Sequence, residues 1–177
     1  QRGQAKTINF GIIYGVSAFG LARRIEGLSV RAAQDLIKAY NSRFPSIEKF
    51  LQQCVMQAQS LGYVETIRGR RRPIPEVHSP VTAIRNGGER MAINSVVQGS
   101  AADLIKLAML NIHRRLKAEN RPSRMLLQVH DELVFETPRS AVEADAELIR
   151  HEMITAMKLR VPLKVDVGWG SNWEEGK

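Results

Sequence analysis

The stretch RMLLQVHDELVFE, residues 124–136, places two adjacent acidic residues, Asp131 and Glu132, between two apolar runs. Its aliphatic and aromatic residues favour β-structure, so we predict two antiparallel strands that meet at a His-Asp-Glu tip. In a continuous strand the two carboxylates would point to opposite faces, whereas a turn at residues 130–132 lets one or both face a common site. A surface hairpin with a solvated acidic turn is the alternative, although the long apolar arms favour burial in a sheet. A divalent metal ion requires several oxygen ligands, so the tip predicts part of a metal site.

The length and composition of the chain narrow its class. With 177 residues, it is long enough for one domain with a substantial core or for two small lobes. No apolar run approaches the roughly 18 residues of a membrane span, and no signal-peptide pattern is present. The single cysteine, Cys54, cannot form an internal disulfide, which favours a reducing compartment such as the cytoplasm. We expect Cys54 to be a packed small side chain rather than a nucleophile.

The chain is strongly basic. Its formal net charge of +8 predicts a polyanionic partner, by charge alone either a nucleic acid or an acidic membrane surface. A solvated basic surface without a partner is the alternative, but the cations cluster in RGRRR (68–72) and HRRLK (113–117). The first cluster is too generic to predict more than contact with a phosphate backbone.

Hydrophobic periodicity and turn residues predict an α+β chain with a mostly helical first lobe, followed by a lobe that mixes long helices with an antiparallel sheet. Ser29 is the expected N-cap of one helix and Pro45 suits the first turn of the next. Two prolines close a hairpin that turns at Gly69. We expect helices over residues 2–14, 18–25, 30–41, 45–60, 88–117 and 139–158, hairpins over 62–75 and 124–136, and a last strand over 162–170.

Four residues recur at intervals of four near the start of the chain: Arg2, Lys6, Phe10 and Tyr14. A step of four drifts only about 40° around a helix, so the row shares one face and extends about 18 Å. Two cations followed by two aromatic rings could hold the phosphates and then the sugar or base of a nucleoside triphosphate. The alternative is an amphipathic helix whose aromatic residues lie in the core.

A second row, Arg90, Asn94 and Gln98, has the same spacing in the long helix. Its hydrogen-bond donors lie about 6 Å apart, and every base pair offers acceptors in the minor groove with little distinction between pairs. Such a row would sense the shape of a base pair without reading its sequence. An ordinary polar helix face is the alternative. The small residues 99–102 keep the helix slim and allow another backbone to approach closely.

Three stretches taken in order resemble the C-terminal part of a family A DNA polymerase, the bacterial DNA polymerase I type. They are RGQAKTINFGIIYG (2–15), ERMAINSVVQGSAAD (89–103) and QVHDELVFE (128–136). The first matches the family's motif B, R-x3-K-x3-F-x3-Y-G, and the last matches motif C, centred on V-H-D-E. The resemblance extends across essentially all of the chain. It implies a fingers subdomain over residues 1–81 and the C-terminal part of a palm over 82–177.

The resemblance also implies roles in nucleotide binding. Arg2 and Lys6 would bind the phosphates of the incoming dNTP, and Lys6 would thereby count among the catalytic residues. Phe10 would lie against the sugar and base, at the position that governs discrimination against dideoxynucleotides, so it implies poor incorporation of chain terminators. Tyr14, with Gly15, would close the pocket of the templating base.

DNA and metal contacts are implied in the same way. The residues expected to touch the template-primer are Tyr14, Gly15, Arg90, Asn94, Gln98, Gln128 and His130. Asp131 would ligate two catalytic Mg²⁺ ions, with Glu132 as the accessory acid. The reaction would be attack of a primer 3′-hydroxyl on the α-phosphorus of a dNTP. No membrane partner is implied.

One part of the family pattern is missing. The other catalytic aspartate belongs to motif A, an S-Q-I-E-L-R-like stretch that should precede motif B. The sequence also opens on QRGQ without an initiating methionine. We therefore expect a segment of a longer polymerase, inactive alone, whose N-terminal part is its partner. A non-catalytic nucleic-acid-binding module on the same fold is the alternative. A generic phosphate-transfer domain would require a loop such as G-x4-G-K-[ST], which the sequence lacks.

Overall fold

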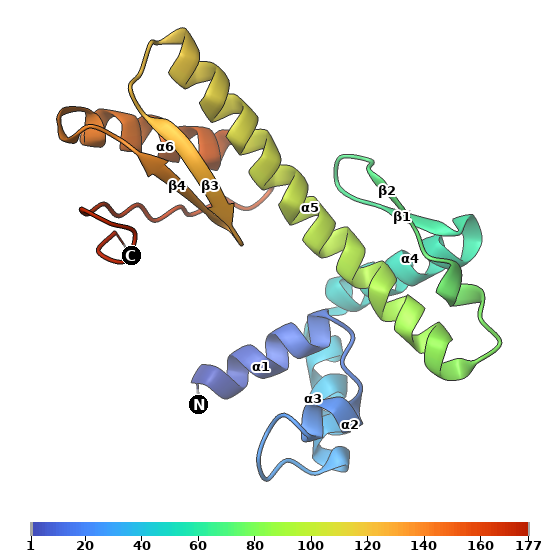
Figure 1. Cartoon of the computed structure of the whole chain (residues 1–177). Helices are drawn as coiled ribbons and strands as arrows, with labels where there is room; N and C mark the ends of the chain where they lie inside the picture. The colour runs from blue at the N-terminus through green and yellow to red at the C-terminus, as the bar shows by residue number, and fades with distance from the viewer. Residues whose placement is uncertain (1, 177) are drawn as a thin grey trace. The chain divides into compact units, whose positions relative to one another are not determined.

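The computed structural model describes residues 2–176 and divides into two compact units between Ser100 and Ala101. The longest helix, α5 (Thr82–Ala118), contributes residues to both units (Figure 1). Each unit combines helices with a two-stranded antiparallel sheet, which confirms the predicted α+β class. The predicted boundary between fingers and palm, at residues 81 and 82, is a functional assignment and stays a prediction. No helix within residues 2–176 has the length and apolar character needed to cross a membrane.

The first helices of unit 1 pack around a small apolar cluster. They are α1 (Arg2–Ile13), α2 (Ala18–Ala22) and α3 (Val30–Arg43). Fully buried Leu21 lies in this cluster. Ser29 caps α3 as predicted, because its side chain accepts a hydrogen bond from the Ala32 N–H at 3.1 Å. The Tyr40 hydroxyl on α3 donates a hydrogen bond to Asn9 Oδ1 on α1 at 2.6 Å. This bond connects α1 to α3.

The rest of unit 1 places a hairpin against two helices. Its elements are α4 (Pro45–Leu61), β1 (Tyr63–Glu65), β2 (Arg71–Pro73), the 3₁₀ helix η1 (Pro75–His78) and the first part of α5. Gly69 adopts φ +76° in the predicted turn. We expected Phe50 and its neighbours to form the inward face of α4, but Phe50 is exposed, while Cys54 and Ala58 are buried. The reason is that α4 packs through Ala58 against the hairpin residue Val64. Burial raises the pKa of the Cys54 thiol, as befits a packed side chain.

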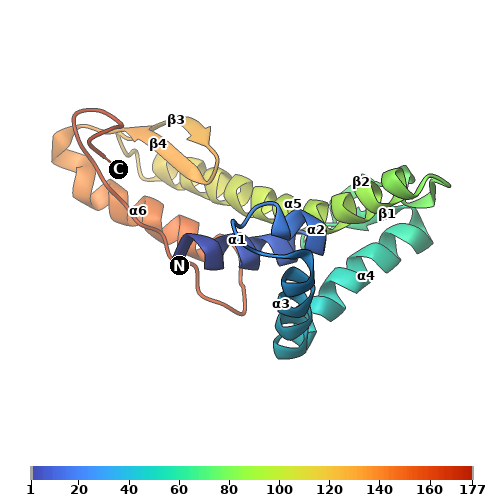
Figure 2. The same ribbon diagram turned by 90° about the horizontal axis from the view of Figure 1, so that it is seen from below.

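The turn of this hairpin packs against α5 at Gly99 and Ser100. Ile67 N–H donates to Ser100 Oγ at 2.9 Å, and Arg70 Nη2 donates to the Gly99 carbonyl at 3.0 Å. A Cβ on Gly99 would lie only 2.7 Å from Thr66 Cγ2. The predicted close approach therefore occurs, and the approaching backbone belongs to the turn between β1 and β2 (Figure 2).

Helix α5 begins six residues earlier than the predicted position 88, at Thr82. A pair of glycines, Gly87 and Gly88, weakens the helical pattern there, although both lie inside the helix. Their surroundings differ: a Cβ on Gly88 would lie 2.8 Å from Val77 N and 2.9 Å from Glu76 C, whereas a Cβ on Gly87 would meet only Arg90 Nη2, at 4.0 Å. The α5–η1 contact thus depends on the second glycine.

Alanine at these two positions should have opposite effects. We expect Gly88→Ala to destabilise the protein by about 1–3 kcal/mol, because the new methyl group meets backbone atoms. Gly87→Ala should stabilise it by about 0.5–1 kcal/mol through the better helix propensity of alanine. Thermal unfolding of the purified variants measures both. Equal shifts for the two variants would contradict the assigned contact.

Unit 2 packs one hairpin against two helices, as Figure 1 shows. After α5 come β3 (Arg124–Val129), β4 (Glu132–Glu136), the 3₁₀ helix η2 (Arg139–Ala141) and α6 (Val142–Thr155). Ile112 and Leu116 of α5 form the core with Leu148 and Ile149 of α6, and Met125, Leu133 and Phe135 pack on them from the hairpin. The expected alternation of β3 is interrupted by an irregularity between Met125 and Leu127, which leaves Leu126 and Leu127 both exposed.

The C-terminal segment differs from the prediction. Residues 162–170 form no strand. A strand requires a partner for its backbone hydrogen bonds, and within residues 2–176 β3 and β4 pair only with each other. In this segment Trp169 and Trp173 are 59% and 43% exposed. The predicted helix over 139–158 is also shorter, because η2 precedes α6.

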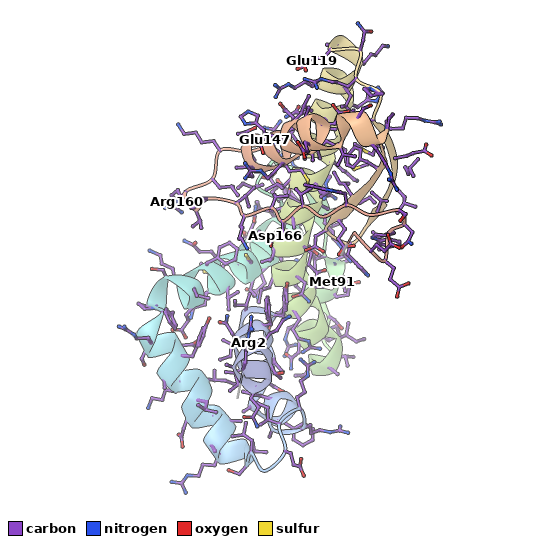
Figure 3. All side chains as sticks on the ribbon, turned by 90° about the vertical axis from the view of Figure 1, so that its left-hand side faces the viewer. Arg2, Met91, Glu119, Glu147, Arg160 and Asp166 are labelled. Carbon is purple, nitrogen blue, oxygen red and sulfur yellow. The ribbon has the colours of Figure 1, made fainter. Side chains whose placement is uncertain are left out.

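A buried carboxylate joins the loop before β3 to α6. Asp145 is fully buried, accepts a hydrogen bond from Arg121 Nη1 at 3.2 Å and another from the Ser123 hydroxyl. Ser123 in turn lies 2.7 Å from Thr137 Oγ1, beyond the end of β4. Arg121 also pairs with Glu119, the residue labelled beyond the end of α5 in Figure 3. Asp145 therefore fixes the open end of the β3–β4 hairpin.

Removing this carboxylate should loosen unit 2. We expect Asp145→Ala to lower the free energy of unfolding by about 2–3 kcal/mol, because hydrogen bonds to a buried charged group are lost. Glu147→Ala on the same helix is the matched control: its ion pair with Arg150 is exposed and screened by solvent, so its loss should change the free energy of unfolding far less than the loss of Asp145. Denaturant unfolding of the purified variants distinguishes the two. Similar small losses would contradict the anchoring role of Asp145.

Candidate active site

The first predicted row lies on the exposed face of α1. Lys6 Nζ is 5.9 Å from the centroid of the Phe10 ring, and the Phe10 and Tyr14 rings stack with centroids 6.2 Å apart and planes 16° apart. Ile12 is buried and lies about 200° around the helix from Phe10, on the opposite face of α1. Phe10 is 45% exposed. The alternative in which this ring belongs to the core is therefore not what the structure shows.

The row borders an open groove of about 550 Å³. Helix α1 and the residue after it supply Gly3, Lys6, Thr7, Phe10, Gly11 and Tyr14, and Arg24 completes the lining. Within residues 2–176, no acidic residue lines the groove. Arg2 is exposed on the first turn of α1, where Figure 3 labels it, and is not among the lining residues. The groove can accept an anion beside a flat, partly apolar group.

The C-terminal end of α1 meets the second predicted row. The Tyr14 N–H donates to the Phe10 carbonyl at 3.0 Å, and Gly15 then adopts φ +72°. A Cβ on Gly15 would lie 3.3 Å from Arg90 Cγ and 3.6 Å from Ile93 Cδ1, both on α5. The glycine permits both the turn and the close approach, and the structure thereby brings the end of the first row to the start of the second.

The second row runs along α5 within unit 1. Arg90 and Gln98 are exposed, whereas Asn94 is half-buried. Among residues 2–176, Asn94 Oδ1 is a buried oxygen that finds no hydrogen-bond partner. The spacing predicted for the row is present, and its polar side chains accompany a slim stretch of helix. This arrangement is equally compatible with a binding surface and with an ordinary polar face.

The acidic tip belongs to unit 2 and is tighter than predicted. Val129 pairs with Glu132, so only His130 and Asp131 form the turn. His130 has φ +55°, the left-handed conformation that a two-residue hairpin requires at its first position. Gln128 Nε2 donates to the His130 carbonyl at 2.9 Å and so stabilises the turn. Asp131 and Glu132 are both exposed at the tip.

The tip suits part of a magnesium site. Carboxylate oxygens are the ligands that Mg²⁺ prefers, and Mg²⁺ is bound by one or two carboxylates together with phosphates and water. Asp131 and Glu132 offer such oxygens from adjacent positions in the sequence, and both are exposed. Nowhere in the described part of the chain do three or more histidine, cysteine or acidic side chains form a group that could hold a metal ion. Asp131 and Glu132 therefore fit part, but not all, of the set of ligands that a Mg²⁺ ion requires.

Sequence reasoning missed Arg24 as a member of the groove. It follows α2 and has no periodic relation to the row on α1, so only the packing of α2 against α1 reveals its position. Thr7, Gly3 and Gly11 follow from their positions on α1 once the groove is known.

Known proteins with related sequences cover nearly all of this chain. The model of DNA polymerase family A matches residues 1–175. DNA polymerase I of Bacillus caldotenax is 44% identical over 176 residues, which is 99% of this chain and 20% of that protein. DNA polymerase I of Pseudomonas aeruginosa is 47% identical over 175 residues, again 99% of this chain and 19% of the relative. The chain thus spans about a fifth of the length of these relatives.

A solved structure is similar throughout the chain. It is the polymerase domain of Pol1 from M. smegmatis, in complex with DNA primer-template and dNTP. That domain is 40% identical, with a TM-score of 0.94 and coverage of 99% of this chain and 31% of the other. Together with the match to the family model over residues 1–175, this establishes that the chain belongs to DNA polymerase family A.

Proposed function

We propose that this chain is the C-terminal part of the polymerase domain of a template-directed DNA polymerase, which adds dNTPs to a primer 3′-hydroxyl. The observation that carries the proposal is the groove on α1, where Lys6 precedes the stacked rings of Phe10 and Tyr14. Membership of family A and the similarity to a polymerase domain bound to primer-template and dNTP support it. In this proposal residues 1–81 are fingers and residues 82–177 are the C-terminal part of the palm.

The groove binds the incoming nucleotide. Arg2 and Lys6 hold the triphosphate, because ammonium and guanidinium groups form strong charge-assisted hydrogen bonds with phosphate oxygens. Phe10 lies against the sugar and base, and Tyr14 with Gly15 closes the pocket of the templating base. The exposure of the Phe10 ring leaves it available for this contact.

The polar row and the hairpin bind the template-primer. Arg90, Asn94 and Gln98 offer donors to the minor-groove acceptors that all base pairs share, which suits a polymerase that must accept every sequence. Gln128 and His130 lie near the primer terminus. Since Gly15 packs on Arg90, a templating base at Tyr14 would lie near the first residue of this row.

The reaction is attack of the primer 3′-oxygen on the α-phosphorus of the dNTP, with release of pyrophosphate. Lys6 offsets the negative charge that builds on the phosphates, and this stabilises the transition state. Asp131, with Glu132 as accessory acid, holds Mg²⁺ at the tip of the hairpin. Two Mg²⁺ ions, when bound, stabilise the entering and leaving oxygens. The tight turn at His130 leaves the carboxylate of Asp131 exposed, which supports this role.

The remaining metal ligand comes from the N-terminal part of the same polymerase, which carries motif A. This accounts for a carboxylate pair without a third ligand in the described residues. The second candidate function, a non-catalytic nucleic-acid-binding module, rests on the same basic charge and polar row. It predicts DNA binding that does not depend on Asp131.

Primer extension by two forms of the protein tests the proposal. We expect the full-length protein to extend a primed template in the presence of Mg²⁺ and dNTPs, and the 177-residue chain alone to give no extension. Circular dichroism of the isolated chain serves as the control for folding. Robust metal-dependent extension by the isolated chain would show that its metal site is complete, and a full-length protein that binds DNA without extending it would support the binding module.

A further inference from the structure

Arg24 is the one lining residue of the groove that comes from outside α1 and Tyr14, which directly follows it. It follows α2, where its N–H donates to the Leu21 carbonyl at 3.0 Å. Its side chain is exposed rather than packed in the core. A cation on a separate element thus completes a groove whose other walls belong to one helix.

The packing of α2 against α1 locates this cation. Leu21 Cδ1 lies 3.7 Å from the position of a Cβ on Gly11, and Ile25 belongs to the same apolar cluster as Ile8. Arg24 falls between these two anchors in the sequence. Its side chain therefore emerges beside the middle of α1, where Lys6 and Phe10 border the groove.

The charge of the groove indicates what Arg24 binds. Among the described residues, Lys6 and Arg24 are the cations of the lining, and no carboxylate accompanies them. A triphosphate presents several anionic oxygens, so it can engage an ammonium and a guanidinium from two sides, and the planar fork of arginine suits two oxygens of one phosphate. We propose that Arg24 is a further substrate-binding residue, which contacts the triphosphate of the incoming nucleotide opposite Lys6. This inference rests on the proposed function of the groove.

The preceding residue provides a matched control. Arg23 carries the same charge one position away, but its guanidinium lies 5.8 Å from the centroid of the Phe19 ring, and it does not line the groove. Changing either arginine to glutamine alters the net charge equally. A difference between the two variants therefore reports on position rather than on overall charge.

Steady-state kinetics of the full-length polymerase test the proposal. We expect Arg24→Gln to raise the KM for dNTP about five-fold with little change in kcat, since one charge-assisted contact is lost. The KM for pyrophosphate in the reverse reaction should rise as well, whereas affinity for the primer-template should not change. Arg24→Lys keeps the positive charge, so its KM for dNTP should lie between those of the wild type and Arg24→Gln. Arg23→Gln should have the wild-type KM. The difference in KM for dNTP between Arg24→Gln and the wild type should become smaller at high ionic strength, because salt screens an exposed contact.

The outcomes separate this proposal from the one on which it depends. If Arg24→Gln matches Arg23→Gln in the KM for dNTP, or weakens DNA binding instead, the role of Arg24 is refuted. Lys6→Ala is measured alongside. Impairment by Lys6→Ala without an effect of Arg24→Gln refutes only the role of Arg24, whereas unchanged synthesis by Lys6→Ala refutes the proposed function of the groove.

Discussion

Replacing Asp131 by asparagine in the full-length protein is expected to reduce kcat for nucleotide incorporation by at least about 10³-fold, or roughly 4 kcal/mol of transition-state stabilisation. Asparagine retains the shape of the side chain but removes the charge that would bind Mg²⁺ in the proposed function. Asp131 is exposed in the two-residue turn, so the change should not disturb the hairpin. Single-turnover incorporation measures the chemical step directly.

The control for this variant lies at the other end of the same hairpin. Glu136 pairs at 3.7 Å with Arg124 across the open end, and its side chain is 65% exposed. Glu136→Gln makes the same change in charge and should leave incorporation within about two-fold, as expected for a surface ion pair. If Asp131→Asn retained synthesis near the wild-type rate, Asp131 would not be a metal ligand and the binding-module alternative would be favoured.

Replacing Lys6 by alanine should have the second largest effect. We expect kcat/KM for dNTP to fall about 10²-fold, or roughly 2.7 kcal/mol, because one positive group facing the phosphates is removed in the transition state. The cation also lies 5.9 Å from the Phe10 ring centroid, but that exposed contact contributes little to stability. Pre-steady-state kinetics with varied dNTP concentration measure the loss.

A lysine remote from the groove provides the comparison. Lys49 is exposed on α4 and is not among the residues that line the groove on α1. Lys49→Ala should therefore leave kcat/KM unchanged, and Lys6→Arg should retain more activity than Lys6→Ala. Loss of DNA affinity by Lys6→Ala, with dNTP kinetics unaltered, would instead assign Lys6 to the template-primer.

The local elements follow closely from the sequence because their signals are local. Ser29 caps α3 through its own side chain, and Gly69 permits a turn that few other residues adopt without strain. The aromatic and cationic row on α1 is likewise a matter of helical spacing. Each of these features depends only on a few residues that are close together in the sequence, so the sequence alone is sufficient to predict it.

Features set by packing were harder to predict. Helix α4 turns the small residues Cys54 and Ala58 inward because the hairpin lies against them, whereas Phe50 remains exposed. The strand expected over 162–170 lacks a neighbour in the described residues, so its favourable composition is not sufficient. Arg24 enters the groove only through the packing of α2 on α1. In each case the outcome depends on a contact between two segments, and the local sequence pattern of either segment does not show that they are in contact.

The contact between Gly15 and Arg90 connects the two predicted rows. The resemblance to family A polymerases implies that one row binds the nucleotide and the other the template-primer, whereas helical spacing does not indicate that the two rows meet. The structure shows that they do, since Gly15 leaves room for the Arg90 side chain at the end of α1. In the proposed function this places the pocket of the templating base beside the first contact with the duplex.

Template-directed incorporation of a single nucleotide tests the central claim most directly. The full-length protein is given a primed template whose first unpaired base is varied in turn, with Mg²⁺ and one dNTP at a time, and the extended primer is quantified. The proposed function predicts extension by one nucleotide with the complementary dNTP and far slower extension with the other three. Extension that ignores the templating base, or tight DNA binding without any extension, would contradict it.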